Sequence, residues 1–224
     1  MPLARIGGRI LFFVHIPKTG GTSVEAYLRA KGALALHGAR ADWSRCTPQH
    51  MHRDLYAELV PPGFYDRGFA ILRDPKARLV SEFRMRAEPL RAKFRPLGAL
   101  RLARNRAAGR PTYGLRIGRR VEFLDFDAWV PRVFAAYRRD PYLKDNHIRP
   151  QAEFVDPAHR LFRLEDGMKA VFAWIDAETG TPPAPGDFHE RRSDPLPVAC
   201  SPATEALIRD FYAADYALIE ESFR

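Results

Sequence analysis

The stretch that determines the fold class is Arg9-Ile-Leu-Phe-Phe-Val-His-Ile-Pro-Lys-Thr-Gly-Gly-Thr-Ser23. Residues 9–14 form a short apolar run with aromatic and β-branched side chains, which predicts a buried strand. The proline and the two glycines that follow prevent regular structure. A helix is predicted over residues 23–31, because Val24, Tyr27 and Leu28 share one face. This part of the chain is therefore expected to form a strand, a glycine loop and a helix.

The rest of the chain repeats this alternation. Strands are predicted at 33–36, 68–72 and 160–164, and helices at 53–60, 76–85, 123–137, 168–176 and 202–223. Strands that alternate with helices at this spacing typically form a parallel sheet. The sequence thus predicts a single α/β domain over residues 1–224, with a mostly parallel central sheet flanked by helices.

The composition excludes several classes of protein. Apolar residues make up 46% of the chain and aromatic residues 12%, which is enough for a core and too much for a disordered chain. The mean hydropathy is −0.34, and no apolar run approaches the roughly 18 residues that cross a bilayer, so we expect a soluble, cytoplasmic protein. Cys46 and Cys200 are too few for a disulfide scaffold or a cysteine-based zinc site.

The net charge of +9 is concentrated in one segment. Between Arg84 and Arg120 there are twelve basic residues and one acid, Glu88. Prolines and glycines in this segment predict an insertion of short helices and loops. Residues 84–120 are a candidate contact for an acceptor or for an anionic or membrane surface, and an arginine-rich insertion without a partner is the alternative. Few aromatic residues are present to stack on bases, which disfavours nucleic acid.

The glycine loop has the features of a phosphate site. Its glycines let successive backbone N–H groups turn toward one point, and the N-terminus of the following helix adds partial positive charge there. Lys18 adds a full charge, and Thr22 and Ser23 add hydroxyl groups. The loop differs from a Walker A motif, in which the lysine follows the last glycine.

A second anion motif is Arg73-Asp-Pro-Lys-Ala-Arg-Leu-Val-Ser81, which leaves one predicted strand and enters a helix. Arg73 lies at the carboxyl end of that strand, where open α/β sheets bind ligands. Ser81 follows about two helical turns later and can return toward the same anion. A guanidinium group together with a hydroxyl suits a terminal phosphate.

Residues 16–23 and 72–81 together resemble the sulfotransferases that use 3′-phosphoadenosine-5′-phosphosulfate (PAPS). The fit is best to the carbohydrate branch of sulfotransferase family 2 that includes heparan sulfate 2-O-sulfotransferases and bacterial members, and it clearly covers residues 9–86. The resemblance implies a three-layer fold like that of P-loop NTPases. It also implies a PAPS site formed by Lys18, Thr19, Gly20, Gly21, Thr22 and Ser23 at the 5′-phosphosulfate and by Arg73 and Ser81 at the 3′-phosphate.

The segment Gln49-His-Met-His52 lies between the two motifs. The 2-O branch has a His-x-His here whose second histidine is taken as the catalytic base, which maps onto His52. An imidazole with a pKa near 6.5 suits proton abstraction at neutral pH. His50, His147 and Arg149 are expected at the acceptor site. No further carboxylate or cysteine lies at a suitable spacing for a metal, so none is predicted.

The expected reaction is in-line transfer of a sulfuryl group from PAPS to a hydroxyl group of a carbohydrate or glycolipid, which releases PAP (3′-phosphoadenosine-5′-phosphate). His52 would remove the proton, and Lys18 would stabilise charge on the departing oxygen. Two alternatives stay open. One is a P-loop-like kinase or phosphotransferase, although no clear carboxylate for Mg²⁺ stands out. The other is a non-catalytic binder of an anionic polymer through residues 84–120.

Overall fold

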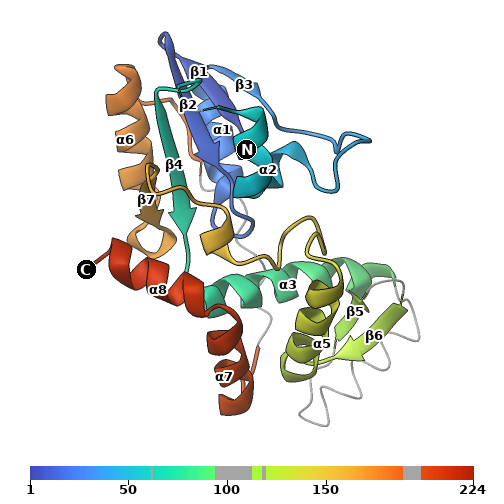
Figure 1. Ribbon diagram of the computed structural model, residues 1–224. Coiled ribbons are helices and arrows are strands. Elements are labelled where there is room, and N and C mark those ends of the chain that lie inside the picture. The colour runs from blue at the N-terminus through green and yellow to red at the C-terminus, as the bar shows by residue number, and fades with distance from the viewer. Residues whose placement is uncertain (62, 94–112, 118–119, 189–197) are drawn as a thin grey trace.

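The computed structural model describes residues 1–61, 63–93, 113–117, 120–188 and 198–224 (Figure 1). Its central sheet has the strand order β3-β1-β2-β4-β7. These strands are β1 (Leu3–Ile6), β2 (Arg9–Val14), β3 (Ala33–Ala35), β4 (Arg67–Leu72) and β7 (Arg160–Arg163). β2, β4 and β7 pair in parallel, and β1 is antiparallel to both β2 and β3. Four of the five strands therefore run in one direction, which confirms a mostly parallel central sheet.

The alternation of side chains along β2 builds one core on each face of the sheet. Leu11 and Phe13 pack with α1 (Gly21–Lys31) and α6 (Lys169–Thr179) on one face. Phe12 and Val14 pack with α2 (Arg53–Leu59) and α8 (Ala213–Ser222) on the other. Successive strand residues point to opposite faces, so a strand with apolar side chains on both faces requires helices on both sides. The sheet is accordingly flanked by helices, as expected.

A third core lies beside the sheet. It is formed by α3 (Pro75–Lys93), α5 (Phe126–Arg139) and α7 (Pro202–Phe211), together with a hairpin of β5 (Tyr113–Ile117) and β6 (Arg120–Leu124). Phe83 of α3 contacts Trp129 of α5, with ring centroids 5.4 Å apart. In Figure 1 the strand β4 points toward α3 and α8, so this core continues from the carboxyl edge of the sheet.

Two features of these elements were not predicted from the sequence. The residues Leu3–Ile6 were not predicted to form a strand, yet they pair with β2 across a turn in which Gly7 and Gly8 have positive φ. The basic insertion was expected to contain short helices and loops, but its described part extends α3 to Lys93 and then forms the β5–β6 hairpin. The hairpin is held by tertiary packing, because Leu115 is fully buried in the same core as Phe83. The remainder of the insertion, residues 94–112 and 118–119, lies outside the described residues.

No described helix combines the length and the apolar composition that a membrane span requires.

Candidate functional site

The glycine loop runs from the end of β2 to the start of α1 and turns sharply. Gly20 is the residue before α1 and has φ 86°, and Lys18 also has a positive φ of 69°. The Thr19 hydroxyl is buried and donates to the Ile16 carbonyl oxygen at 2.9 Å, which closes the loop on itself. Thr19 therefore serves the loop's shape, whereas Thr22 is exposed at the start of the helix. The first amides of a helix lack i−4 acceptors and can bind an anion, and in α1 the Ser23 amide donates to the Gly20 carbonyl oxygen at 3.1 Å.

His15 packs directly against the end of this loop. A Cβ atom at Gly21 would lie 1.9 Å from the Nε2 atom of His15, so only glycine fits at this position. The Nδ1 atom of His15 lies 2.6 Å from a carboxylate oxygen of Glu25, one turn further along α1. His15 thus links the end of β2 to the first turns of α1 and holds the loop in place.

The second predicted motif meets the glycine loop in space. Arg73 directly follows β4, and its guanidinium donates to the carbonyl oxygen of Lys18 at 3.1 Å. The amide of Arg73 donates to Gln151 Oε1 at 3.0 Å, and the Gln151 amide donates back to the Arg73 carbonyl at 2.8 Å. These contacts fix Arg73 beside the loop. The Lys18 ammonium also reaches α3, where it lies 3.5 Å from the sulfur of Met85.

Ser81, the other residue predicted for the 3′-phosphate, is buried on α3. The helix begins at Pro75, and the carboxylate of Asp74 accepts a hydrogen bond from the Ala77 amide at 2.7 Å in its first turn. Asp74 therefore caps α3. Arg73 and Ser81 consequently belong to one strand–turn–helix unit, which stands next to the glycine loop.

Arg78, also on α3, ties this unit to two other segments. Its side chain is buried, and it donates to the carbonyl oxygens of Pro17 at 2.9 Å, of His147 at 3.0 Å and of Arg149 at 2.9 Å. One guanidinium therefore fixes the glycine loop relative to the segment 146–151.

Three histidines come together behind the glycine loop, and we name them the histidine cluster: His15, His50 and His147. The ring centroids of His15 and His50 are 4.9 Å apart, and those of His50 and His147 are 5.0 Å apart. Each Nδ1 atom lies against a carboxylate oxygen, at 2.6 Å for His15–Glu25 and at 2.7 Å for both His50–Asp145 and His147–Glu82. Burial lowers the pKa of all three imidazoles, that of His50 to about 4, so the rings are neutral near pH 7.

The carboxylates of the cluster are held ionised by their neighbours. Burial would raise the pKa of Asp145, but hydrogen bonds from His50 and from the amide and hydroxyl of Thr47 outweigh it and hold that pKa well below its usual range. The pKa of Glu82 is likewise lowered despite full burial, through the His147 and Arg86 side chains. An ionised carboxylate only accepts hydrogen bonds, so each pair places the imidazole proton on Nδ1.

His52 lies in different surroundings from His50. It precedes α2, and its ring centroid is 5.5 Å from that of Tyr142. Its Nδ1 atom is buried without a hydrogen-bond partner in the described part of the chain. Burial, followed by the charge of Arg149, lowers the pKa of His52. The assignment of His52 as catalytic base stays a prediction.

The predicted acceptor residues separate into two groups. His50 and His147 are neighbours in the histidine cluster. Arg149 is buried, and its guanidinium donates to Asn146, Glu153 and the Pro141 carbonyl. This network already holds Arg149 inside the protein.

Folding brings a carboxylate to two histidines, which the sequence argument against a metal did not foresee. One atom each of His50, Asp145 and His147 lies within 4.8 Å of the others. Hydrogen bonds with carboxylates already occupy the Nδ1 atoms of His50 and His147. Lys144, the residue before Asp145, donates to the Arg116 carbonyl oxygen at 2.9 Å, and burial together with the charge of Arg86 lowers its pKa to about 8. The absence of a metal stays a prediction.

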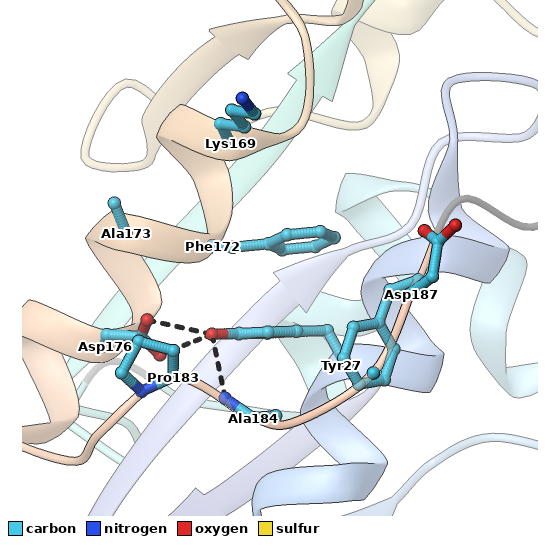
Figure 2. Close-up of a pocket in the computed structure, with 10 residues that line it drawn as sticks. Tyr27, Lys169, Phe172, Ala173, Asp176, Pro183, Ala184 and Asp187 are labelled. Carbon is cyan, nitrogen blue, oxygen red and sulfur yellow. Dashed lines mark hydrogen bonds between the residues drawn. The ribbon is translucent and has the colours of Figure 1, made fainter.

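A separate pocket of about 330 Å³ lies between α1, α6 and the segment 183–188 (Figure 2). Figure 2 shows Tyr27 lying parallel to Phe172, with ring centroids 4.1 Å apart and the Tyr27 hydroxyl donating to the carboxylate of Asp176 at 2.7 Å. None of the site residues predicted from the sequence lines this pocket. Its aromatic contacts belong to the packing of α1 against α6.

The sequence reasoning missed the three carboxylates of the cluster. Asp145 is 95 residues from His50, and Glu82 is 65 residues from His147. The available signal was weak: Asp145 lies two residues before His147, and Glu82 directly follows Ser81.

One of the comparisons with known proteins gives a match. The model of the sulfotransferase family matches residues 8–218, which is nearly the whole chain. No curated protein and no solved structure matches the chain. The matched region includes the glycine loop, the Arg73–Ser81 motif and the histidine cluster. The chain belongs to the sulfotransferase family, and it is therefore a sulfotransferase.

Proposed function

We propose that the chain transfers the sulfuryl group of PAPS to a hydroxyl group of a carbohydrate or glycolipid acceptor and releases PAP. The observation that carries this proposal is the contact of Arg73 with the Lys18 carbonyl at 3.1 Å. It joins two cationic motifs that are 55 residues apart in the sequence. One motif suits a 5′-phosphosulfate and the other a 3′-phosphate, which distinguishes PAPS from ATP.

The roles of the residues follow from charge and position. The first amides of α1, with Thr22 and Ser23, bind the 5′-phosphate, as in a P-loop-like phosphate site. Lys18 stabilises negative charge on the bridging oxygen that leaves with PAP. Arg73 and Ser81 bind the 3′-phosphate. Because the Gln151 side chain and the Lys18 carbonyl already hold Arg73, little reorganisation is needed when the donor binds.

The acceptor and the location of the reaction are proposed from the sequence. A hydroxyl of a carbohydrate or glycolipid fits the branch that the two motifs resemble. Contact with an anionic or membrane surface through residues 84–120 stays a prediction, and so does a cytoplasmic location. Most of that segment lies outside the described residues.

Ligand binding tests the proposed donor. Thermal unfolding is measured with PAP, with adenosine 5′-phosphosulfate, which lacks the 3′-phosphate, and with ATP plus Mg²⁺. We expect PAP to stabilise the protein most, because it fills both anion sites. Greater stabilisation by ATP with Mg²⁺ would favour a phosphotransferase, and none by any nucleotide would favour a polymer binder.

A matched pair of variants locates the 3′-phosphate site. Arg67 and Arg73 stand at opposite ends of β4, and the Arg67 side chain is 63% exposed. Arg73→Ala is expected to lower the affinity for PAP about tenfold or more, and to bring it close to the affinity for adenosine 5′-phosphosulfate. Arg67→Ala should keep the ratio of the two affinities at its wild-type value. An unchanged ratio in Arg73→Ala would contradict the assignment.

A further inference from the structure

His50 is held by one turn of the chain through both its side chain and its backbone. It ends a 3-10 turn (Pro48–His50), and its Nδ1 atom lies 2.7 Å from the carboxylate of Asp145. The next residue, Asn146, donates from its side chain to the His50 carbonyl at 2.8 Å. Asp145 in turn accepts from the Thr47 amide at 2.6 Å. The ring orientation and the tautomer of His50 are therefore set before any acceptor binds.

The turn that provides Asp145 is strained. Lys144, Asp145 and Asn146 have φ values of 55°, 61° and 63°, and none of them is glycine. Consecutive left-handed residues with side chains cost free energy, and they persist where surrounding contacts enforce them. Here the hydrogen bonds to Thr47 and His50 are those contacts. Such strain is often found at functional sites.

The other nitrogen of His50 is an acceptor. The amide nitrogen of Gln49 lies 3.4 Å from His50 Nε2. An amide nitrogen only donates, so the ring nitrogen accepts, in agreement with the proton on Nδ1. This bond is long and weak, and Gln49 is only half-buried. His50 itself is only 6% exposed, so an acceptor hydroxyl group reaches its Nε2 atom by displacing the Gln49 amide.

His50 is also connected to the proposed donor site. Its ring contacts that of His15, which packs against Gly21 at the start of α1. Its other neighbour, His147, follows the turn of Asp145, and Arg78 joins the His147 carbonyl to the Pro17 carbonyl of the glycine loop. His52 has none of these features: among the described residues its Nδ1 has no hydrogen-bond partner, and the ring lies against Tyr142.

We propose that His50, oriented by Asp145, is the group that accepts the proton of the acceptor hydroxyl, in place of His52. This assignment rests on the proposed function. The acceptor O–H bond breaks and its proton goes to His50 Nε2, while the acceptor oxygen forms a bond to sulfur. The bond between sulfur and the bridging oxygen breaks, and its electron pair leaves with the 5′-phosphate of PAP. Asp145 is a positioning residue that stabilises the imidazolium, as in an Asp–His pair. The proton then passes from His50 to water.

Turnover of radiolabelled PAPS tests the assignment. The acceptors are a panel of phenyl glycosides and unsulfated polysaccharides, together with water, and PAP affinity is measured in parallel. His50→Ala is expected to lower kcat about 100-fold or more with PAP affinity kept within about twofold. The loss in His52→Ala should be at least about tenfold smaller. His37→Ala, outside the cluster, controls for the preparation. A larger loss in His52→Ala than in His50→Ala would overturn the proposal.

Asp145→Asn separates positioning from folding. The Thr47 amide would keep the Asn oxygen on its side, so the Asn amide would face His50 Nδ1 and donate to it. The imidazole proton would then move to Nε2, which removes the proton acceptor. We expect kcat to fall about tenfold or more. In addition, ¹⁵N NMR should show the Nδ1–H tautomer for wild-type His50 and the Nε2–H tautomer in the variant. A wild-type Nε2–H tautomer would overturn the proposal even if His50→Ala fails to fold.

Two further outcomes keep the inference distinct from the proposed function. Wild-type protein that binds no PAP and turns over no PAPS would refute the function and the inference together. Wild-type turnover that survives in His50→Ala would refute the inference alone. Loss of wild-type turnover in EDTA would also overturn it, because a bound metal would then activate the hydroxyl.

Discussion

Replacement of Arg78 tests the packing between the glycine loop and the histidine cluster. Its guanidinium makes three hydrogen bonds to carbonyl oxygens at 2.9–3.0 Å, and its side chain is 1% exposed. In Arg78→Met the apolar volume is mostly kept, but three carbonyl groups lose a charged donor. Each such bond contributes about 1.5–3 kcal/mol, and because losses within one network do not add fully we expect about 4 kcal/mol in total.

Urea and thermal unfolding, followed by tryptophan fluorescence, measure this loss. A chain of this size loses about 2–4 °C in Tm per kcal/mol, so Arg78→Met should unfold about 10 °C lower. PAP affinity should also fall, because the glycine loop loses its anchor at Pro17. The control is Arg45→Ala, whose side chain is 63% exposed and pairs with Asp140 at 2.7 Å. An exposed pair of this kind contributes under about 1 kcal/mol. A loss in Arg78→Met as small as in this control would refute the reasoning.

Three further predictions follow from burial and close packing. Gly21→Ala places a Cβ atom 1.9 Å from His15 Nε2, so we expect a loss of about 2–3 kcal/mol and weaker PAP binding, and an unchanged Tm would contradict this. Burial takes the pKa of His50 from 6.5 to about 4. The unfolded chain therefore gains a proton first as the pH falls through this range, and up to about 3 kcal/mol of stability is lost. Urea unfolding should show that the free energy of unfolding falls less between pH 7 and pH 5 in His50→Gln than in wild type. An equal fall in both proteins would contradict the lowered pKa of His50. Burial raises the pKa of Asp215, whose Oδ2 atom has no partner in the described structure. Stability is therefore lost as the pH rises from the ordinary value of 3.8 through the raised pKa of the folded state, and the advantage of Asp215→Asn over wild type should grow from pH 4 to pH 7 rather than stay constant.

Local sequence sufficed for the strand–loop–helix at residues 9–31 and for the Arg73 motif. The apolar run of five residues at 10–14, followed closely by glycines and a helix, indicates a buried strand, and the carboxyl end of a parallel strand is where α/β sheets bind ligands. β1 was not predicted because it has only four residues and its pairing with β2 depends on the turn at Gly7 and Gly8. The β5–β6 hairpin was not predicted because the packing of Leu115 beside Phe83, rather than local propensity, stabilises it.

The sequence by itself determined the class of fold, the two anion motifs and the presence of histidines between them. Only the tertiary structure decided which histidine has a carboxylate on its ring. His50 meets Asp145 across 95 residues, and His52, two residues away, meets no such partner among the described residues. The physical reason is that a hydrogen bond requires atoms within about 3 Å. Spacing along the chain sets that distance within a helix or a turn, whereas between distant segments only the packing of the folded chain sets it.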